Sequence, residues 1–183
     1  MKNILVFCGA NKGAHKKYAE LTTQVGLYLA QQGKTIIYGG GSVGLMGVLA
    51  DAALSENGAV IGIITEQLEK MEVGHKGLTE MITVEDMQTR KVRMLEMTDA
   101  SIALPGGYGT LDEIFEALTL SQLHVFPKAV GLLNFEGFFT PLVEQLDLMT
   151  REGFISSANR DLFIVEDSIE VLMDKLSHWT IPN

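Results

Sequence analysis

Short apolar runs alternate with amphipathic helical patterns along the whole chain, and this alternation restricts the fold more than any other feature. Several of the runs are too short for helices and lack polar alternation, which is typical of strands covered on both faces. Strands separated by helices form βαβ units, whose right-handed crossovers join parallel strands. The sequence therefore predicts a doubly wound parallel sheet. The expected strands are residues 4–7, 35–38, 60–64, 81–84, 101–104, 129–133 and 162–165.

The connecting segments read mostly as helices. They are expected near residues 18–32, 43–52, 85–98, 110–123, 138–151 and 168–178. Residues 65–79 show no clear period and are expected to be a loop that could contain one helical turn. At 183 residues and 46% hydrophobic content, the chain fits one domain that buries about 70% of its unfolded surface. We expect residues 1–183 to form a single α/β three-layer sandwich.

Charge and cysteine content restrict the function. The net charge of −9 argues against nucleic acid or an anionic membrane as the main partner, and no apolar run approaches the length of a membrane span. Cys8 is the single cysteine, so no internal disulfide is expected, and neither a CxxC motif nor a histidine cluster predicts a metal site. These features favour a soluble cytoplasmic protein with a small ligand.

The first glycine motif is Gly39-Gly-Gly-Ser-Val-Gly44, which matches GxGxxG between an expected strand and helix. Glycines let the backbone approach a phosphate, and a helix N-terminus supplies N–H donors. Ser42 suits the N-cap of that helix. A tight turn that needs small residues for packing is the alternative. The complete dinucleotide fingerprint is disfavoured, because it normally follows the first strand.

The second motif is Pro105-Gly-Gly-Tyr-Gly-Thr-Leu-Asp-Glu113, again between a strand and a helix. It predicts a second set of backbone donors, with Thr110 as a hydroxyl donor. Two such turns at neighbouring strand ends suit a nucleotide or a sugar phosphate. Glu113 is expected in the first helical turn, where it either acts in the chemistry or complements the helix dipole.

The third feature is the basic cluster Arg90-Lys91-x-Arg93 in an expected helix. Arg90 and Arg93 share a helix face, and a guanidinium binds phosphate or carboxylate with fixed geometry. Taken alone, the cluster reads as a solvated basic patch. Met87, Met94 and Met97, on the same helix, are expected to fill the core.

Together these motifs resemble the LOG ("Lonely guy") proteins, long labelled possible lysine decarboxylases. Residues 105–113 match the signature PGGxGTxxE, and the resemblance extends over Phe7-Cys-Gly, residues 38–47, Met87-Gln-Thr-Arg-Lys91 and residues 130–134. It implies a Rossmann-like fold, a homodimer, and hydrolysis of the N-glycosidic bond of nucleoside 5′-monophosphates. Cytokinin ribotides or AMP would yield free base and ribose 5-phosphate without a cofactor.

The resemblance also implies site residues. Arg90 and Glu113 fall on the family's catalytic positions. The substrate-binding positions are Gly40, Gly41, Ser42, Glu72, Lys91, Gly106, Gly107, Tyr108, Gly109, Thr110 and Thr119. Ala10, Gln88 and Leu120 depart from residues common in the family, and Leu120 would alter the pocket wall.

Mechanistically, glycosidic cleavage develops oxocarbenium character on the ribose, so a carboxylate such as Glu113 would either stabilise that positive charge or activate water. Arg90 would hold phosphate, orient that carboxylate or stabilise the leaving base. Decarboxylation would need pyridoxal phosphate on a lysine, and no lysine has a recognisable context for it. The rival functions are a non-catalytic nucleotide or molybdenum-cofactor carrier and a dinucleotide-dependent oxidoreductase.

Overall fold

The seven expected strands form one parallel sheet. The computed structural model describes residues 1–72 and 74–181, and the side chain of Glu72 lies outside that description. The strand order is β4-β3-β2-β1-β5-β6-β7, and every neighbouring pair is parallel. The strands are β1 (Asn3–Phe7), β2 (Thr35–Tyr38), β3 (Ala59–Thr65), β4 (Glu80–Val84), β5 (Ala100–Ala103), β6 (Ala129–Leu133) and β7 (Phe163–Glu166).

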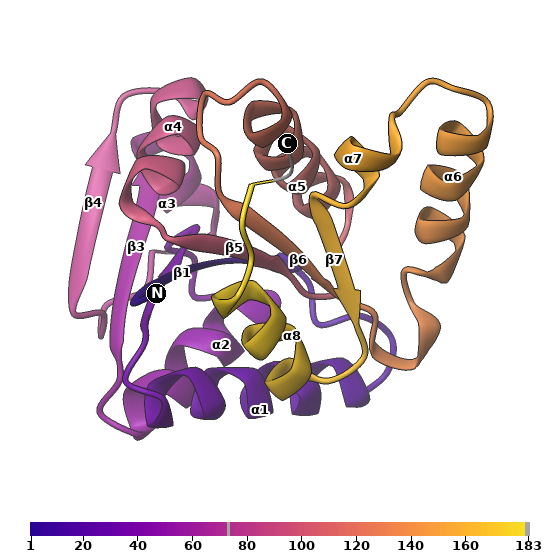
Figure 1. The fold of residues 1–183 in the computed structure, drawn as a ribbon. Helices are drawn as coiled ribbons and strands as arrows, with labels where there is room; N and C mark the ends of the chain where they lie inside the picture. Colours follow the sequence, from indigo (N-terminus) through magenta and orange to yellow (C-terminus); the bar gives the residue numbers. More distant parts are fainter. Residues whose placement is uncertain (73, 182–183) are drawn as a thin grey trace.

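Helices cover both faces of this sheet (Figure 1). One core joins the sheet to α1, α2 and α8 and includes the fully buried Leu29, Leu49 and Leu172. The other core lies under α4, α5 and α6 and includes Met94 and Ile114. The helices are α1 (Lys17–Gln31), α2 (Gly44–Ser55), α3 (Glu66–Glu72), α4 (Met87–Met97), α5 (Tyr108–Gln122), the 3-10 helix η1 (Phe135–Gly137), α6 (Thr140–Arg151), α7 (Ser157–Arg160) and α8 (Ile169–Ser177).

The order of the strands places a crevice between β1 and β5. The chain winds outward from β1 through β2, β3 and β4, and β5 then returns to the other side of β1, where Phe7 pairs with Ala103. Ligands of open α/β sheets bind beyond the carboxyl ends of the strands at such a switch point. The predicted doubly wound α/β sandwich is thus confirmed.

Three local predictions were wrong. Residues 65–79 contain the seven-residue helix α3, which the sequence pattern did not reveal. The N-cap of α2 is Val43, not Ser42, and no side chain caps this helix. The two glycine turns do not follow neighbouring strands, because β1 lies between β2 and β5.

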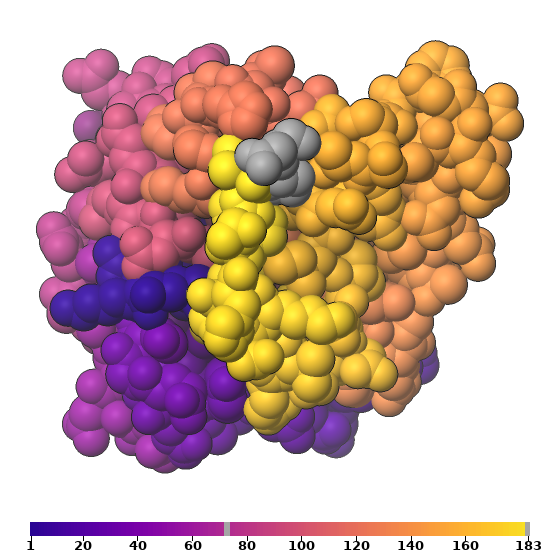
Figure 2. Space-filling view, in the orientation of Figure 1, coloured from indigo at the N-terminus to yellow at the C-terminus, as the bar shows by residue number. Residues whose placement is uncertain are grey.

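Helix boundaries follow from local chemistry elsewhere. Asp86 caps α4 by accepting the Thr89 N–H at 2.8 Å, and Gly33, with a φ of +64°, ends the turn after α1. The N-terminal residues and the segment around α8 lie on the same face of the molecule (Figure 2). Among the residues described, no helix is both long enough and apolar enough to cross a membrane.

Candidate active site

A pocket of about 630 Å³ opens at the switch point between β1 and β5. Its walls come from the loops after these two strands, the start of α2, and parts of α3 and α4. The lining includes Arg90, Glu113 and all of residues 105–110. The structure therefore brings the two expected catalytic residues together with the second glycine turn.

The turn after β5 contributes residues 105–110 to the pocket lining. Thr110 is 3% exposed, and its Oγ1 is buried without a hydrogen-bond partner in the described structure. A Cβ on Gly106 would lie 2.0 Å from that oxygen, so only glycine fits there. A Cβ on Gly107 or Gly109 would meet nothing within 4 Å, so protein packing does not explain these two glycines.

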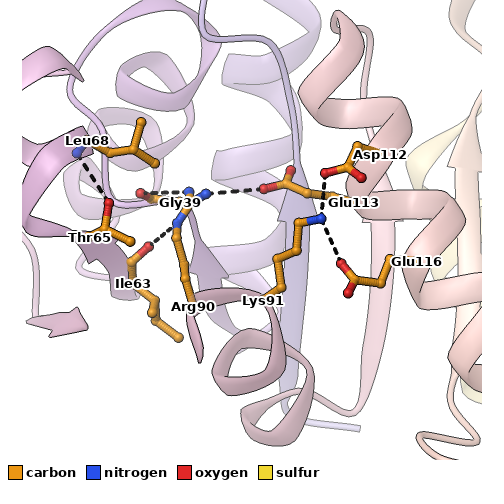
Figure 3. Close-up of polar contacts among 9 residues, drawn as sticks. All are labelled: Gly39, Ile63, Thr65, Leu68, Arg90, Lys91, Asp112, Glu113 and Glu116. Atoms are coloured by element: carbon orange, nitrogen blue, oxygen red, sulfur yellow. Dashed lines mark hydrogen bonds and ion pairs between the residues drawn. The ribbon is translucent and has the colours of Figure 1, made fainter. Parts of the chain in front are cut away.

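Arg90 is almost fully buried, and its donors point in three directions (Figure 3). Its Nε donates to the Ile63 carbonyl at 2.8 Å, and its Nη2 donates to the Gly39 carbonyl at 3.1 Å. Its Nη1 lies 3.5 Å from Oε1 of Glu113. The guanidinium thus connects the ends of β2 and β3 to α5. Arg93, by contrast, is exposed and lies 3.4 Å from Glu96. The interpretation of Arg90 as part of a solvated patch was wrong.

Glu113 lies in the second turn of α5, not the first, because the helix already begins at Tyr108. The dipole effect falls off within the first turn, so it accounts poorly for this carboxylate. Glu113 lines the pocket and faces Arg90. Its position favours a role in chemistry over a role in helix capping.

The first glycine turn does not line the pocket, and its backbone is engaged in other contacts. The Gly39 carbonyl accepts from Arg90, and the Gly40 carbonyl accepts the His75 N–H at 2.9 Å. A Cβ on Gly39 would lie 2.3 Å from Arg90 Nη2. This turn therefore supports Arg90, an arrangement that fits the packing alternative. Ser42 is exposed beside it.

The N-terminus of α2 is likewise occupied by protein. The Leu45 N–H donates to the Gly9 carbonyl at 2.9 Å. A Cβ on Gly44, whose φ is +64°, would lie 2.2 Å from the Ala10 carbonyl carbon. This end of α2 holds the loop after β1 in place.

Lys91 and Thr119 line a separate, shallower groove beside the pocket, together with Leu111, Phe115 and Leu120. Lys91 Nζ lies 2.6 Å from Asp112 Oδ2 and 3.0 Å from Glu116 Oε2 (Figure 3). Burial alone would lower the pKa of Lys91, but the hydrogen bonds that its ammonium donates to these two carboxylates, together with their charges, outweigh burial and raise the pKa. Thr119 donates its hydroxyl to the Phe115 carbonyl at 2.7 Å. Asp112 borders both hollows.

The remaining expected residues are placed as follows. Tyr108 lines the pocket and is 94% exposed. Glu72 ends α3, and its side chain lies outside the described part of the chain. Among the described residues, no group of three His, Cys, Asp or Glu side chains is placed to hold a metal ion.

Sequence reasoning missed several pocket residues. Met87 is 43% exposed and lines the pocket, although it was expected in the core with Met94. Lys12, Leu68 and Phe138 also line it. The place of Lys12 just after the first strand was the one available signal, since strand ends form the ligand edge of such sheets.

Comparisons with known proteins agree with the motifs. The family model described as "Possible lysine decarboxylase" matches residues 46–176. The chain is 45% identical to the cytokinin riboside 5′-monophosphate phosphoribohydrolase of Rhodococcoides fascians, covering 92% of this chain and 86% of that protein. It is 39% identical to a protein of the same name from Arabidopsis thaliana, covering 97% and 84%.

Solved structures share the fold at low sequence identity. The molybdenum cofactor binding protein of Rippkaea orientalis superimposes with a TM-score of 0.72 at 22% identity, covering 97% of this chain and 96% of that one. The Moco carrier protein of Chlamydomonas reinhardtii gives a TM-score of 0.68 at 19% identity, covering 96% and 99%. These likenesses concern the fold alone. The family match and the identity to full-length relatives show that this chain belongs to the LOG family, whose model is described as possible lysine decarboxylases.

Proposed function

We propose that this protein hydrolyses the N-glycosidic bond of a nucleoside 5′-monophosphate, a cytokinin ribotide or AMP, to free base and ribose 5-phosphate. The relatives from Rhodococcoides fascians and Arabidopsis thaliana are named cytokinin riboside 5′-monophosphate phosphoribohydrolases. The observation that supports it most is the pair formed by buried Arg90 and partly buried Glu113, which lines the same pocket as the glycine turn after β5.

The 5′-phosphate would bind at the start of α5. Helix N-termini attract phosphate through free N–H groups and the helix dipole. Gly107 and Gly109 leave the backbone open on the pocket side. The unpartnered Thr110 hydroxyl gains an acceptor when a phosphate oxygen is present, and this offsets the cost of burying it alone. We assign substrate binding to residues 106–110 on these grounds.

Glu113 would act on the ribose. Breaking the bond between C1′ and the base nitrogen leaves positive charge on the sugar, and a nearby carboxylate stabilises that charge. Water then forms the new bond to C1′ and gives a proton to Glu113. The departing base takes up a proton from solvent, and Glu113 returns its own proton to solvent, which restores the carboxylate. Glu113 lies one helical turn after Thr110, so a sugar whose phosphate is at residues 106–110 would place its ring near this carboxylate.

Arg90 would position Glu113. Two of its three donor directions are committed to the carbonyls of Ile63 and Gly39, and the third faces Glu113. This leaves little capacity for a phosphate. Of the three roles open from the sequence, orientation of the carboxylate is the one that this geometry favours.

The proposal includes the setting of the enzyme. We infer that residues 1–183 act as one nucleotide-binding domain, that the protein is cytoplasmic and that it forms a homodimer. Lys91 and Thr119 line a separate groove with the apolar Phe115 and Leu120. We therefore do not assign Lys91 or Thr119 a direct contact with substrate bound in the pocket of the same chain. We likewise assign no direct substrate contact to Gly40, Gly41, Ser42 or Glu72.

The alternative function is that of a non-catalytic carrier, because solved structures with the same fold are described as a molybdenum cofactor binding protein and a Moco carrier protein. A carrier needs a binding pocket but no buried ion pair beside it. Incubation with AMP and with adenosine, followed by chromatographic product analysis, tests both ideas. Free adenine and ribose 5-phosphate from AMP, with adenosine cleaved far more slowly, are expected. AMP that is bound but returned unchanged would support a carrier, and equal cleavage of adenosine would contradict the phosphate site.

A further inference from the structure

Lys12 lies in the loop that joins β1 to α1 and lines the pocket, yet no motif of the sequence assigned it a role. We propose that Lys12 binds the 5′-phosphate of the substrate and sets the preference for phosphorylated over unphosphorylated nucleosides. This inference rests on the proposed function, because it deepens the substrate choice of the same pocket.

The loop of Lys12 is adjacent to the proposed phosphate site. The Gly9 N–H donates to the Pro105 carbonyl at 3.2 Å, which joins the start of this loop to the turn after β5. A Cβ on Gly106 would lie 3.0 Å from the Gly9 nitrogen. Lys12 follows Gly9 by three residues and lines the same pocket as Thr110. An ammonium on a flexible stem can therefore reach an anion held at the start of α5.

The charges of the pocket single out Lys12. Four charged side chains line it: Lys12, Arg90, Asp112 and Glu113. Arg90 faces Glu113, and Asp112 is 2.6 Å from Lys91. Lys12 has no carboxylate within ion-pair distance among the described side chains. It is thus the cation of this pocket that no acidic partner neutralises, in a chain whose net charge is −9.

The loop is fixed on both sides, so little order has to be gained when a ligand binds. Gly13, with a φ of +74°, packs against Tyr18, since a Cβ there would lie 2.9 Å from the Tyr18 ring. That ring meets Phe138 edge-on at 5.6 Å. On the other side, Gly44 packs against Ala10. A preorganised loop loses less conformational entropy on binding than a free one.

Binding measurements on Lys12→Met test the proposal without depending on turnover. Ribose 5-phosphate carries the phosphate but no base, and adenosine carries the base but no phosphate. Loss of a charge-assisted contact should raise the dissociation constant for ribose 5-phosphate by about tenfold to a hundredfold at low salt. The adenosine dissociation constant should stay within about twofold. Lys12→Arg should restore most of the phosphate affinity, since it keeps the charge.

Lys16→Met is the matched control, because Lys16 lies four residues away, is exposed and does not line the pocket. It removes the same charge and should leave both affinities unchanged. Equal ribose 5-phosphate affinity in wild type and Lys12→Met would overturn the proposal, as would equal losses for ribose 5-phosphate and adenosine. Failure of the wild type to bind ribose 5-phosphate would overturn it as well. Absence of base release from AMP would contradict the proposed function alone, because the Lys12-dependent phosphate affinity is measured separately.

Discussion

Replacing Arg90 by lysine is expected to lower the free energy of unfolding by about 2–4 kcal/mol. The guanidinium donates to the Ile63 carbonyl in β3 and to the Gly39 carbonyl just after β2, and it faces one carboxylate; a single ammonium cannot span all three. The substitution removes at least one hydrogen bond from a charged donor, worth about 1.5–3 kcal/mol, and leaves a buried carbonyl without its partner. Urea unfolding followed by circular dichroism should show a lower midpoint with an unchanged slope.

Arg90→Lys in a Glu113→Gln background separates the contribution of the two carbonyl hydrogen bonds to stability from that of the contact with Glu113. The two bonds to carbonyls, at 2.8 and 3.1 Å, are shorter than the 3.5 Å contact to Glu113. Most of the stability loss should therefore persist when Glu113 is uncharged. Arg93→Lys, on the same helix but exposed, is the control and should change stability by less than about 0.5 kcal/mol. A loss that disappears in the Glu113→Gln background would refute the idea that the Ile63 and Gly39 carbonyls hold Arg90.

Three further predictions use single substitutions. Gly44→Ala should lower the free energy of unfolding by more than about 2 kcal/mol, because the new Cβ would lie 2.2 Å from Ala10 and the φ of Gly44 is positive. A melting temperature equal to that of the wild type would contradict this. Gly109→Ala should leave the free energy of unfolding unchanged or raise it by up to about 1 kcal/mol, while the affinity for AMP falls. An unchanged AMP affinity in calorimetry would show that the Gly109 backbone does not bind the phosphate. The Asn3 and Lys2 N–H groups lower the pKa of Asp99, so its contribution to stability is present above its unfolded-state pKa, about 4, and is lost as the pH falls through the depressed value. Asp99→Asn should therefore flatten the acid limb of a stability–pH curve, and an identical limb would disprove this.

The layers of the fold were predictable from the sequence because strand and helix patterns depend on local periodicity. Apolar strands such as residues 129–133 are buried on both faces, as their lack of alternation indicated. Strand order was less accessible, since it depends on which edge of the sheet each crossover joins. The expectation that both glycine turns follow neighbouring strands failed for this reason.

Some features of the candidate site could also be predicted from the sequence, and others could not. The turn at residues 106–110 carries its own signal, because glycines before a helix indicate open backbone donors. The burial of Arg90 could not be seen, because its partners Ile63 and Gly39 are 27 and 51 residues away and contribute only carbonyls. Every residue has a backbone carbonyl, so the amino-acid sequence does not indicate which carbonyls accept these hydrogen bonds. The place of Lys12 in the pocket had only a weak signal, its position just after the first strand, because it also depends on the approach of two loops in space.

The central claim, that the charge of Glu113 carries the chemistry, is tested most directly by base release from AMP in Glu113→Gln. Glutamine keeps the shape and an oxygen but loses the negative charge that would face the developing oxocarbenium ion. The rate should fall by about 100- to 1000-fold, equivalent to roughly 3–4 kcal/mol, while AMP affinity and melting temperature stay near wild type. A folded Glu113→Gln protein that binds AMP and releases adenine at a near-normal rate would contradict the account.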